Sequence, residues 1–413
     1  MLLRARVVFP VGSPPIENGA VRIGEGRILE VGRSDTIRPT AGASCVDLGE
    51  TILLPGLINA HCHLDLTLLA RHIPPPSSFT DWVKQLISLK AGWSYTDFAQ
   101  SWLTGMHQLI ESGTTTVGDI VTVPELLPDV LPVLPLRITT FREIISIRNR
   151  GQPDALVESA ARDLESVTAP LRHAGLSPHA PYSTYQDLVA RAAAECRSRG
   201  WRWSMHLAES IEEQSMFREC TGPLFHWLKS QRDMSDCGGV SPFEWLEATQ
   251  ALSPELLLAH VNLVNEAEIR RLATSGAQVV HCPRSHDYFQ HPPFPYHELV
   301  QAGVRICLGT DSLVSVRSSR GQLPTLSLFA EMAAFAHAHP EVKPNRIVEH
   351  ATRDGALGLG WNDTGVLAPR LSADLITIPW SGSTRQAAEA IVHHEGPVIS
   401  SMVEGQWIQG PLL

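Results

Sequence analysis

The chain has 413 residues, of which 43% are hydrophobic and 18% are charged, and its formal net charge is −10. This length permits a large core and more than one domain, whereas the negative charge, without long blocks of one sign, argues against nucleic acid or an anionic membrane surface as the main partner. The N-terminus lacks a signal-peptide pattern, no apolar run is long enough to span a bilayer, and the seven cysteines are scattered. We therefore expect a cytoplasmic protein with reduced thiols.

The two ends of the chain share a pattern of short strands. Near the N-terminus, strands are predicted at 6–9, 20–23 and 27–31, with a hairpin turn at 24–26. The pattern returns near the C-terminus, at 374–378, 397–399 and 407–408. We expect residues 1–54 and 368–413 to join into one small β-sandwich.

The central part, residues 55–367, alternates predicted strands with predicted helices. Eight strands are counted from Leu57, and the Val-, Ile- and Leu-rich runs suit a buried parallel sheet. The pattern indicates an α/β protein with a (β/α)8 TIM-type barrel. The predicted helices lie at 79–90, 98–111, 155–167, 186–198, 266–275 and 296–302. The predicted strands end near His63, Asp119, Phe141, His179, His206, His260, His281 and Asp311.

The first of these strands ends in His61-Cys62-His63. Residues i and i+2 of a strand point to the same face, so the two imidazoles can aim at one point, as a metal that prefers nitrogen donors requires. Taken alone, the motif is equally compatible with two unrelated histidines. The histidines and Asp311 at the ends of later strands favour the metal, because barrel active sites are built at the C-terminal ends of strands.

Two carboxylates have alternative interpretations. Glu209 follows the strand that ends in His206, where it can move protons beside a metal or serve as a helix-start carboxylate. Asp311 can be a metal ligand or a helix cap. His281 is expected in a supporting or packing role, and Cys62 and Cys282 in packing. The remaining histidines, including His337 and His339, are expected at the surface.

The ordered set of motifs resembles the amidohydrolase superfamily, in particular its cytosine deaminase, methylthioadenosine deaminase and triazine chlorohydrolase branch. The motifs are residues 55–63, 206–209, His260, 281–285 and 309–312, and the resemblance covers essentially the whole chain. It implies that one divalent metal, zinc first and iron or manganese as alternatives, is bound by His61, His63, His206 and Asp311. It also implies that Glu209 moves protons, that His260 orients the attacking water, with Asp311 as a further base, and that His179 contacts substrate.

Local details bear on metal number and substrate. Two-metal relatives need a bridging ligand, typically a carboxylated lysine, and residues 176–183 contain no lysine. The segments 63–67, 79–82, 309–315 and 326–332 are similar to those of aminofutalosine deaminases. Arg284 can anchor a substrate carboxylate or can be a solvated arginine. His286 stands where the branch commonly has asparagine, and with 287–295 it can shape the pocket rim.

The leading hypothesis is hydrolytic deamination of a small heterocyclic substrate, an aminated purine-type nucleoside or a relative of one. The alternative is a non-deaminating amidohydrolase that acts on a cyclic amide or a halogenated ring. A third hypothesis, from another class, is a non-catalytic barrel scaffold. A homodimer fits the base rate for soluble enzymes.

Overall fold

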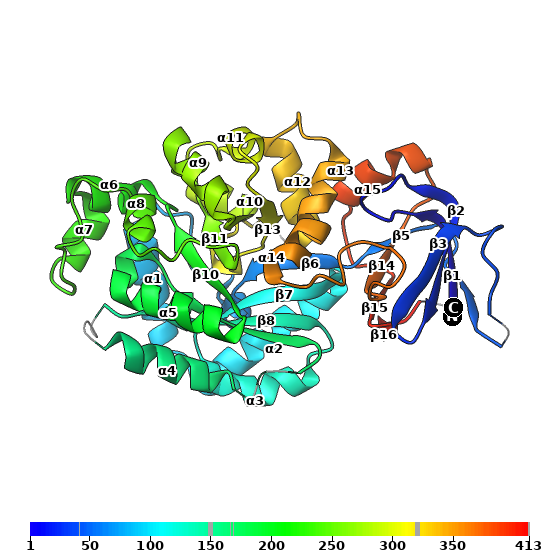
Figure 1. Cartoon of the computed structure of the whole chain (residues 1–413), viewed down its shortest axis with the longest axis horizontal. Helices are drawn as coiled ribbons and strands as arrows, with labels where there is room; N and C mark the ends of the chain where they lie inside the picture. Colours follow the sequence, from blue (N-terminus) through cyan, green and yellow to red (C-terminus); the bar gives the residue numbers. More distant parts are fainter. Residues whose placement is uncertain (41, 148–151, 166, 168, 319–322, 412–413) are drawn as a thin grey trace.

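A computed structural model describes residues 1–40, 42–147, 152–165, 167, 169–318 and 323–411. The described strands form two sheets of eight strands each. Figure 1 shows one of them as a barrel surrounded by helices and the other beside it, at the right of the view. In the described part of the chain, no helix is both long enough and apolar enough to cross a membrane.

The barrel sheet is parallel, and each strand pairs with the next one along the chain. A bridge between Cys62 and Asp311 brings the last strand region back to the first. The (β/α)8 prediction is therefore confirmed. The strands are β6 (Leu57–Cys62), β7 (Thr114–Val121), β8 (Arg137–Ile144), β9 (Arg172–Pro178), β10 (Arg202–Leu207), β11 (Leu256–His260), β12 (Gln278–His281) and β13 (Ile306–Leu308).

The seam between β6 and β13 is closed by side chains as well as backbone. The Asn59 side-chain N–H donates to the Thr310 hydroxyl at 2.8 Å, and the Thr310 backbone N–H donates to the side-chain oxygen of Asn59 at 3.0 Å. The Asp311 N–H donates to the His61 carbonyl at 3.0 Å. Gly309 permits this approach, since a Cβ there would lie 2.8 Å from the His61 carbonyl oxygen.

Helices cover the outside of the barrel. Ser94 begins α2 with a capping box, so this helix starts three residues before the prediction. The helix predicted at 155–167 ends at Asp163, and residue 166 lies outside the described part. The α-helices are α1 (Phe79–Ala91), α2 (Tyr95–Glu111), α3 (Leu127–Val130), α4 (Pro153–Asp163), α5 (Gln186–Arg199), α6 (Ile211–Glu219), α7 (Gly222–Leu228), α8 (Pro242–Glu247), α9 (Glu266–Ser275), α10 (Pro283–Phe289), α11 (Tyr296–Gln301), α12 (Leu328–Ala338), α13 (Pro344–Glu349), α14 (Gly355–Leu359) and α15 (Ala387–Val392).

The second sheet contains strands from both chain ends, as predicted, in the order β16-β15-β14-β5-β1-β2-β3, with β4 paired to β1. The join is the antiparallel pair β5–β14. The strand predicted at 397–399 is wrong by position, because the observed strand begins at Ser400. The domain limits at 54 and 367 stay a prediction. The strands are β1 (Leu2–Val8), β2 (Ile16–Gly24), β3 (Arg27–Arg33), β4 (Cys45–Asp47), β5 (Thr51–Pro55), β14 (Leu375–Pro379), β15 (Ser400–Val403) and β16 (Gln406–Gln409).

Candidate active site

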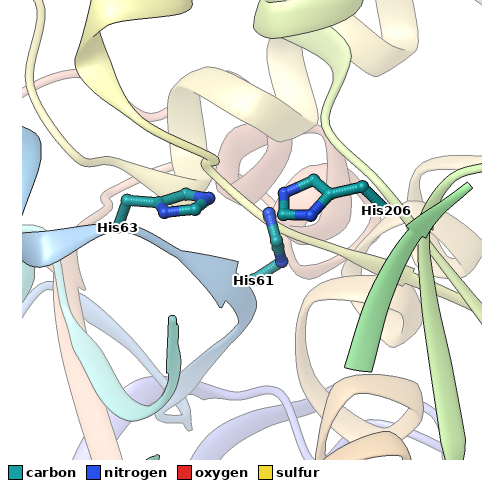
Figure 2. A group of neighbouring side chains, drawn as sticks. All are labelled: His61, His63 and His206. Carbon is teal, nitrogen blue, oxygen red and sulfur yellow. The ribbon is translucent and has the colours of Figure 1, made fainter. Parts of the chain in front are cut away.

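Three histidines converge at the C-terminal end of the barrel. His61 and His63 come from the end of β6 and His206 from β10, and a ligand nitrogen of each lies within 4.8 Å of those of the others. Figure 2 shows the three rings directed toward one another. Among the described residues, both ring nitrogens of His61 and the Nδ1 of His63 are buried without a hydrogen-bond partner. Orphaned buried nitrogens are costly, and a metal ion that bound one nitrogen of each ring would remove part of that cost, so this donor set fits a metal ion.

The protonation states of His63 and His206 suit metal binding. Burial is the main cause that holds the pKa of His63 and of His206 well below the usual histidine value, so both rings are neutral at pH 7. The Nδ1 of His206 lies 2.9 Å from the carbonyl oxygen of His179. Because a carbonyl oxygen only accepts hydrogen bonds, this nitrogen must carry the ring proton. This contact fixes the tautomer and leaves the Nε2 of His206 free to act as a ligand.

Asp311 lies beside the histidines. Its Oδ1 is 3.7 Å from the Nε2 of His61 and 3.5 Å from the Nε2 of His63. Burial alone would raise the pKa of this carboxyl, but its contacts with the surrounding histidines outweigh burial and hold the pKa well below its usual range. Asp311 is therefore ionised, and it completes a set of three imidazoles and one carboxylate that suits a divalent metal.

Glu209 and His260 form a second pair next to these residues. The Oε1 of Glu209 is 3.7 Å from the Nε2 of His260, and both side chains are buried. Burial, followed by the charges of Asp311 and Glu213, raises the pKa of Glu209 well above its usual value. Burial lowers the pKa of His260 to about 4. A carboxyl with a raised pKa beside a neutral imidazole is the arrangement that general acid–base chemistry uses.

His179 occupies the position that the sequence predicts, at the end of β9. Its Nδ1 lies 2.6 Å from the hydroxyl oxygen of Ser183, and its Nε2 lies 3.9 Å from the Oε1 of Glu143. Burial lowers the pKa of His179, so its ring is uncharged. His179 lines the cavity described below, where a substrate can reach it.

The backbone is strained at the strand ends that carry the site. Four residues other than glycine have positive φ angles there: Ala208 (50°), His260 (74°), Val261 (53°) and Asp311 (54°). Such conformations cost about 1–3 kcal/mol each and persist where the surrounding structure enforces them. Two of these residues, His260 and Asp311, line the active-site cavity, so the fold positions them there at an energetic cost.

A cavity of about 210 Å³ opens in front of the site. His63, His206, Glu209, His260 and Asp311 are among the residues that line it. Its walls are largely apolar and come mainly from α1, α7 and the segment after β8. The apolar lining residues are Leu66, Phe79, Trp82, Val83, Leu86, Ile87, Ile145, Ile147, Trp227 and Leu228. A flat, mostly apolar ring suits such a cavity.

Arg284 and His286, predicted as substrate contacts, do not line this cavity. Both line a neighbouring cavity of about 730 Å³. The Nε of Arg284 donates to the buried Glu331 at 2.6 Å, so its charge is already neutralised. The Nδ1 of His286 lies 3.1 Å from the Asn262 side-chain oxygen, and the Asn262 amide donates to the Glu209 carbonyl at 3.0 Å. Asn262 therefore links His286 to the backbone of Glu209.

The predicted positions of the other histidines are correct for some of them and wrong for others. His281 is buried and stacked on Phe294 with ring centroids 3.9 Å apart, as its predicted packing role requires. His337 is exposed, whereas His339 is half-buried. The prediction of a surface position is wrong for His350, which is fully buried. Its Nδ1 lies 2.8 Å from the carbonyl oxygen of Ile306 in β13.

Sequence reasoning missed two charged residues of the cavity, Lys90 and Glu143. Lys90 lies in the last turn of α1, and Glu143 near the end of β8. The signal for Glu143 is an acidic residue two positions after the end of the predicted strand 137–141. Lys90 carries no such signal, because a lysine near a helix C-terminus is favoured by the helix dipole alone.

The profile of the Amidohydrolase family matches residues 52–408. A 5-methylthioadenosine/S-adenosylhomocysteine deaminase of Nitratidesulfovibrio vulgaris is 27% identical over 386 residues, which cover 90% of this chain and 81% of that protein. An aminodeoxyfutalosine deaminase of Deinococcus radiodurans is 26% identical over 372 residues, or 87% of this chain and 85% of that protein.

Two solved structures share the fold at lower identity. The aminofutalosine deaminase of Helicobacter pylori, in complex with methylthio-coformycin, has a TM-score of 0.86 and 20% identity over 98% of this chain and 99% of its own. The atrazine chlorohydrolase TrzN of Arthrobacter aurescens, complexed with zinc, has a TM-score of 0.85 and 19% identity over 100% of this chain and 96% of its own.

Proposed function

The chain belongs to the Amidohydrolase family, and from that premise we propose that it is a metal-dependent hydrolase that removes ammonia from an aminated purine-type nucleoside or a related heterocycle. The observation that carries the proposal is the convergence of three ligand nitrogens within 4.8 Å beside Asp311 and Glu209. The names of the relatives agree with it, since both act on adenosine-type nucleosides as deaminases.

One divalent metal is proposed, with zinc as the first choice. His61, His63, His206 and Asp311 would hold it, and the lack of a lysine between 176 and 183 supports a single ion. Zinc accompanies the structural neighbour TrzN, and imidazole with carboxylate is a ligand set that zinc commonly takes. When bound, the metal supplies a water molecule whose pKa is lowered towards neutrality.

The chain's own residues then manage the protons. Glu209 takes a proton from the attacking water and delivers it to the ring nitrogen, and it then moves the proton of the newly formed hydroxyl to the departing amino group, so that an amino group and water become a carbonyl and ammonia. His260, neutral and 3.7 Å from Glu209, orients the water. His179, at the cavity wall, holds the heterocycle against Glu209. The apolar walls exclude bulk water from the remaining faces of the ring.

The same arrangement can hydrolyse a carbon–chlorine bond or a cyclic amide, so a non-deaminating hydrolase is the second candidate. TrzN, which is named an atrazine chlorohydrolase, shares the fold of this chain. Ammonia release separates the two candidates. The third hypothesis is a scaffold without activity. The presence of all four proposed ligands and of Glu209 argues against it.

The test is a screen for ammonia release by zinc-loaded protein. The panel holds aminopurine nucleosides, aminodeoxyfutalosine, cytosine, guanine and aminotriazines, together with a chlorotriazine and a cyclic amide for the second candidate, and the Asp311→Asn variant is the blank. Release of ammonia from nucleosides supports the proposal. Metal-loaded protein that releases chloride or opens a cyclic amide, but never releases ammonia, overturns it in favour of the second candidate.

A further inference from the structure

A separate cavity, of about 400 Å³, lies at the end of the barrel opposite to the candidate active site. Among its lining residues, Arg172 and Arg202 are the first residues of β9 and β10, and Glu255 directly precedes β11. The same three strands lead to proposed active-site residues at their other ends. Strands of five to seven residues, at about 3.3 Å per residue, put roughly 20 Å between the two sites.

The lining of this cavity is basic, and we call it the basic cavity. Arg172, Arg197 and Arg202 line it, and among the described residues around it Glu255 is the only one with a carboxylate. The whole chain carries a formal net charge of −10, so three arginines with one glutamate depart from its overall balance. A positive cavity in an acidic protein attracts anions from solution.

None of the three arginines is neutralised by an ion pair. In the part of the chain that the structure describes, no carboxylate oxygen lies within 4.0 Å of their side-chain nitrogens. Their observed partners are backbone carbonyls. Arg172 donates to the carbonyl of Leu131 at 2.5 Å. Arg202 donates to the carbonyls of Pro254 at 2.5 Å and Leu357 at 3.2 Å. These contacts hold the guanidinium groups in place and leave their charge uncompensated.

Local structure accounts for only one of these charges. Arg197 is exposed and lies in the last turn of α5, where the helix dipole favours a cation. Arg172 and Arg202 are half-buried at the starts of strands, where no helix dipole acts and a sheltered charge is costly unless it is paired. Gly360 leaves room for Arg202, because a Cβ there would lie 3.0 Å from the Nε of the arginine.

The chemistry of the cavity selects its ligand. A guanidinium has five N–H donors, roughly a fork that matches the oxygens of a phosphate, and the carbonyl contacts leave donors free on both Arg172 and Arg202. A phosphate carries more than one negative charge and can compensate two arginines at once. The cavity is larger than a phosphate ion, and the amide of Asn362 and the ring of His173 also line it, so a small molecule that carries the phosphate fits as well.

We propose that the basic cavity is a second ligand site, which binds a multiply charged oxyanion of the phosphate type through Arg172, Arg197 and Arg202. The oxyanion is either free phosphate or the phosphate group of a small molecule. The site is distinct from the proposed metal centre, and the inference holds whether or not the chain is a deaminase. A bound oxyanion joins the starts of β9 and β10 and stabilises the folded chain.

The experiment is calorimetric titration of the zinc-loaded protein at constant ionic strength with inorganic phosphate, with ribose 5-phosphate and with singly charged acetate. We expect saturable binding of the phosphate compounds, one per chain, and none of acetate at the same concentrations. Tighter binding of ribose 5-phosphate than of phosphate identifies a phosphorylated molecule as the ligand. Equal affinity identifies free phosphate, and both results support the site.

Variants assign the binding to the basic cavity. Arg172→Gln should weaken phosphate binding about tenfold or more, and the exposed Arg197→Gln about threefold or more, because each removes charge-assisted hydrogen bonds. Glu255→Gln should tighten it about two- to fivefold, since it removes the repelling carboxylate. Arg270→Gln, on an exposed part of α9, is the matched control and should bind like the wild type.

The two kinds of variant keep the test decisive. If Arg172→Gln does not fold, Arg197→Gln and Glu255→Gln still predict changes of opposite sign. Phosphate binding that is unchanged in both of these variants overturns the inference, as does acetate binding as tight as that of phosphate. Phosphate binding that is lost on removal of zinc and kept in the arginine variants belongs to the metal centre and also overturns it.

Discussion

The hydroxyl of Ser285 donates to the Oδ2 of Asp311 at 2.7 Å, and this contact orients the carboxylate. Ser315 donates to the same oxygen at 3.1 Å. With Oδ2 held on one side, Oδ1 is turned toward His61 and His63. Ser285 belongs to α10 and follows the seventh barrel strand, so a neighbouring segment positions a residue at the end of the eighth.

Replacing Ser285 with alanine should weaken metal binding about tenfold or more, because residues that orient a ligand commonly contribute 10- to 100-fold to affinity. Zinc affinity measured by competition with a chelator checks this. Ser198→Ala, an exposed serine on α5, is the control and should bind zinc like the wild type. Unchanged zinc affinity in the Ser285→Ala variant would show that Asp311 needs no such support or is not a ligand.

Replacing Glu209 with glutamine should leave zinc content unchanged and lower kcat by about 10²–10⁴-fold, the usual contribution of general acid–base catalysis. Metal analysis of the purified variant and steady-state kinetics are the two measurements. Loss of zinc in this variant would instead make Glu209 a ligand, and near-normal turnover would remove it from the proton path.

The buried carboxyl of Glu213 should make the stability of the folded chain depend on pH. Burial raises its pKa from the ordinary 4.5 to about 8. At pH values between these two, the Glu213 carboxyl keeps its proton in the folded chain and has lost it in the unfolded chain. The unfolding free energy should therefore fall as pH rises through this window, by at most about 1.4 kcal/mol per pH unit from this residue, and level off above about pH 8.

Glu213→Gln mimics the protonated side chain and should flatten this part of the profile. Denaturant unfolding at a series of pH values gives the comparison, with Glu158→Gln on α4 as the control. Identical profiles for Glu213→Gln and the wild type would show that the Glu213 carboxyl titrates near its ordinary value.

The seam of the barrel should contribute measurably to stability. Asn59→Leu removes both hydrogen bonds to Thr310 and leaves its N–H buried without a partner, which costs about 1–3 kcal/mol. Equilibrium unfolding in denaturant checks the loss. Thr310→Ser keeps the hydroxyl and the N–H and should lose less. Equal stability of Asn59→Leu and the wild type would mean that other contacts close the barrel.

Removal of the metal should abolish turnover and lower the unfolding temperature. At a free zinc concentration about 1,000 times Kd, binding to the folded state alone stabilises by about 4 kcal/mol. Scanning calorimetry with and without chelator measures the shift, and zinc restored afterwards should recover both stability and activity. A chelated protein that still turns over substrate would separate the chemistry from the histidine cluster.

Much of the barrel and the proposed metal ligands could be read from the sequence, because strand ends in a parallel barrel meet at one face. His61, His206 and Asp311 are each placed by a local apolar run. Side chains whose positions depend on distant segments could not be placed in this way. Arg284 is neutralised by Glu331 of α12, 47 residues further along the chain.

The cavity walls show the same limit. Lys90 is brought to the site by the packing of α1, and no short-range pattern encodes that packing. His350 is buried in a π-helical turn against β13, which helical periodicity does not reveal. The position of Glu143 in the cavity could have been predicted from the sequence. Like Asp311, it is an acidic residue at the C-terminal end of a barrel strand, where active-site residues lie.

The most direct test of the central claim is turnover of an adenosine-type nucleoside by the zinc-loaded protein in water labelled with the heavy oxygen isotope. The account predicts that ammonia and a deaminated nucleoside form in equal amounts, and that each product molecule carries one labelled oxygen at the carbon that bore the amino group. Product without ammonia, or a product carbonyl that lacks the label at early times, would contradict hydrolytic deamination at this site.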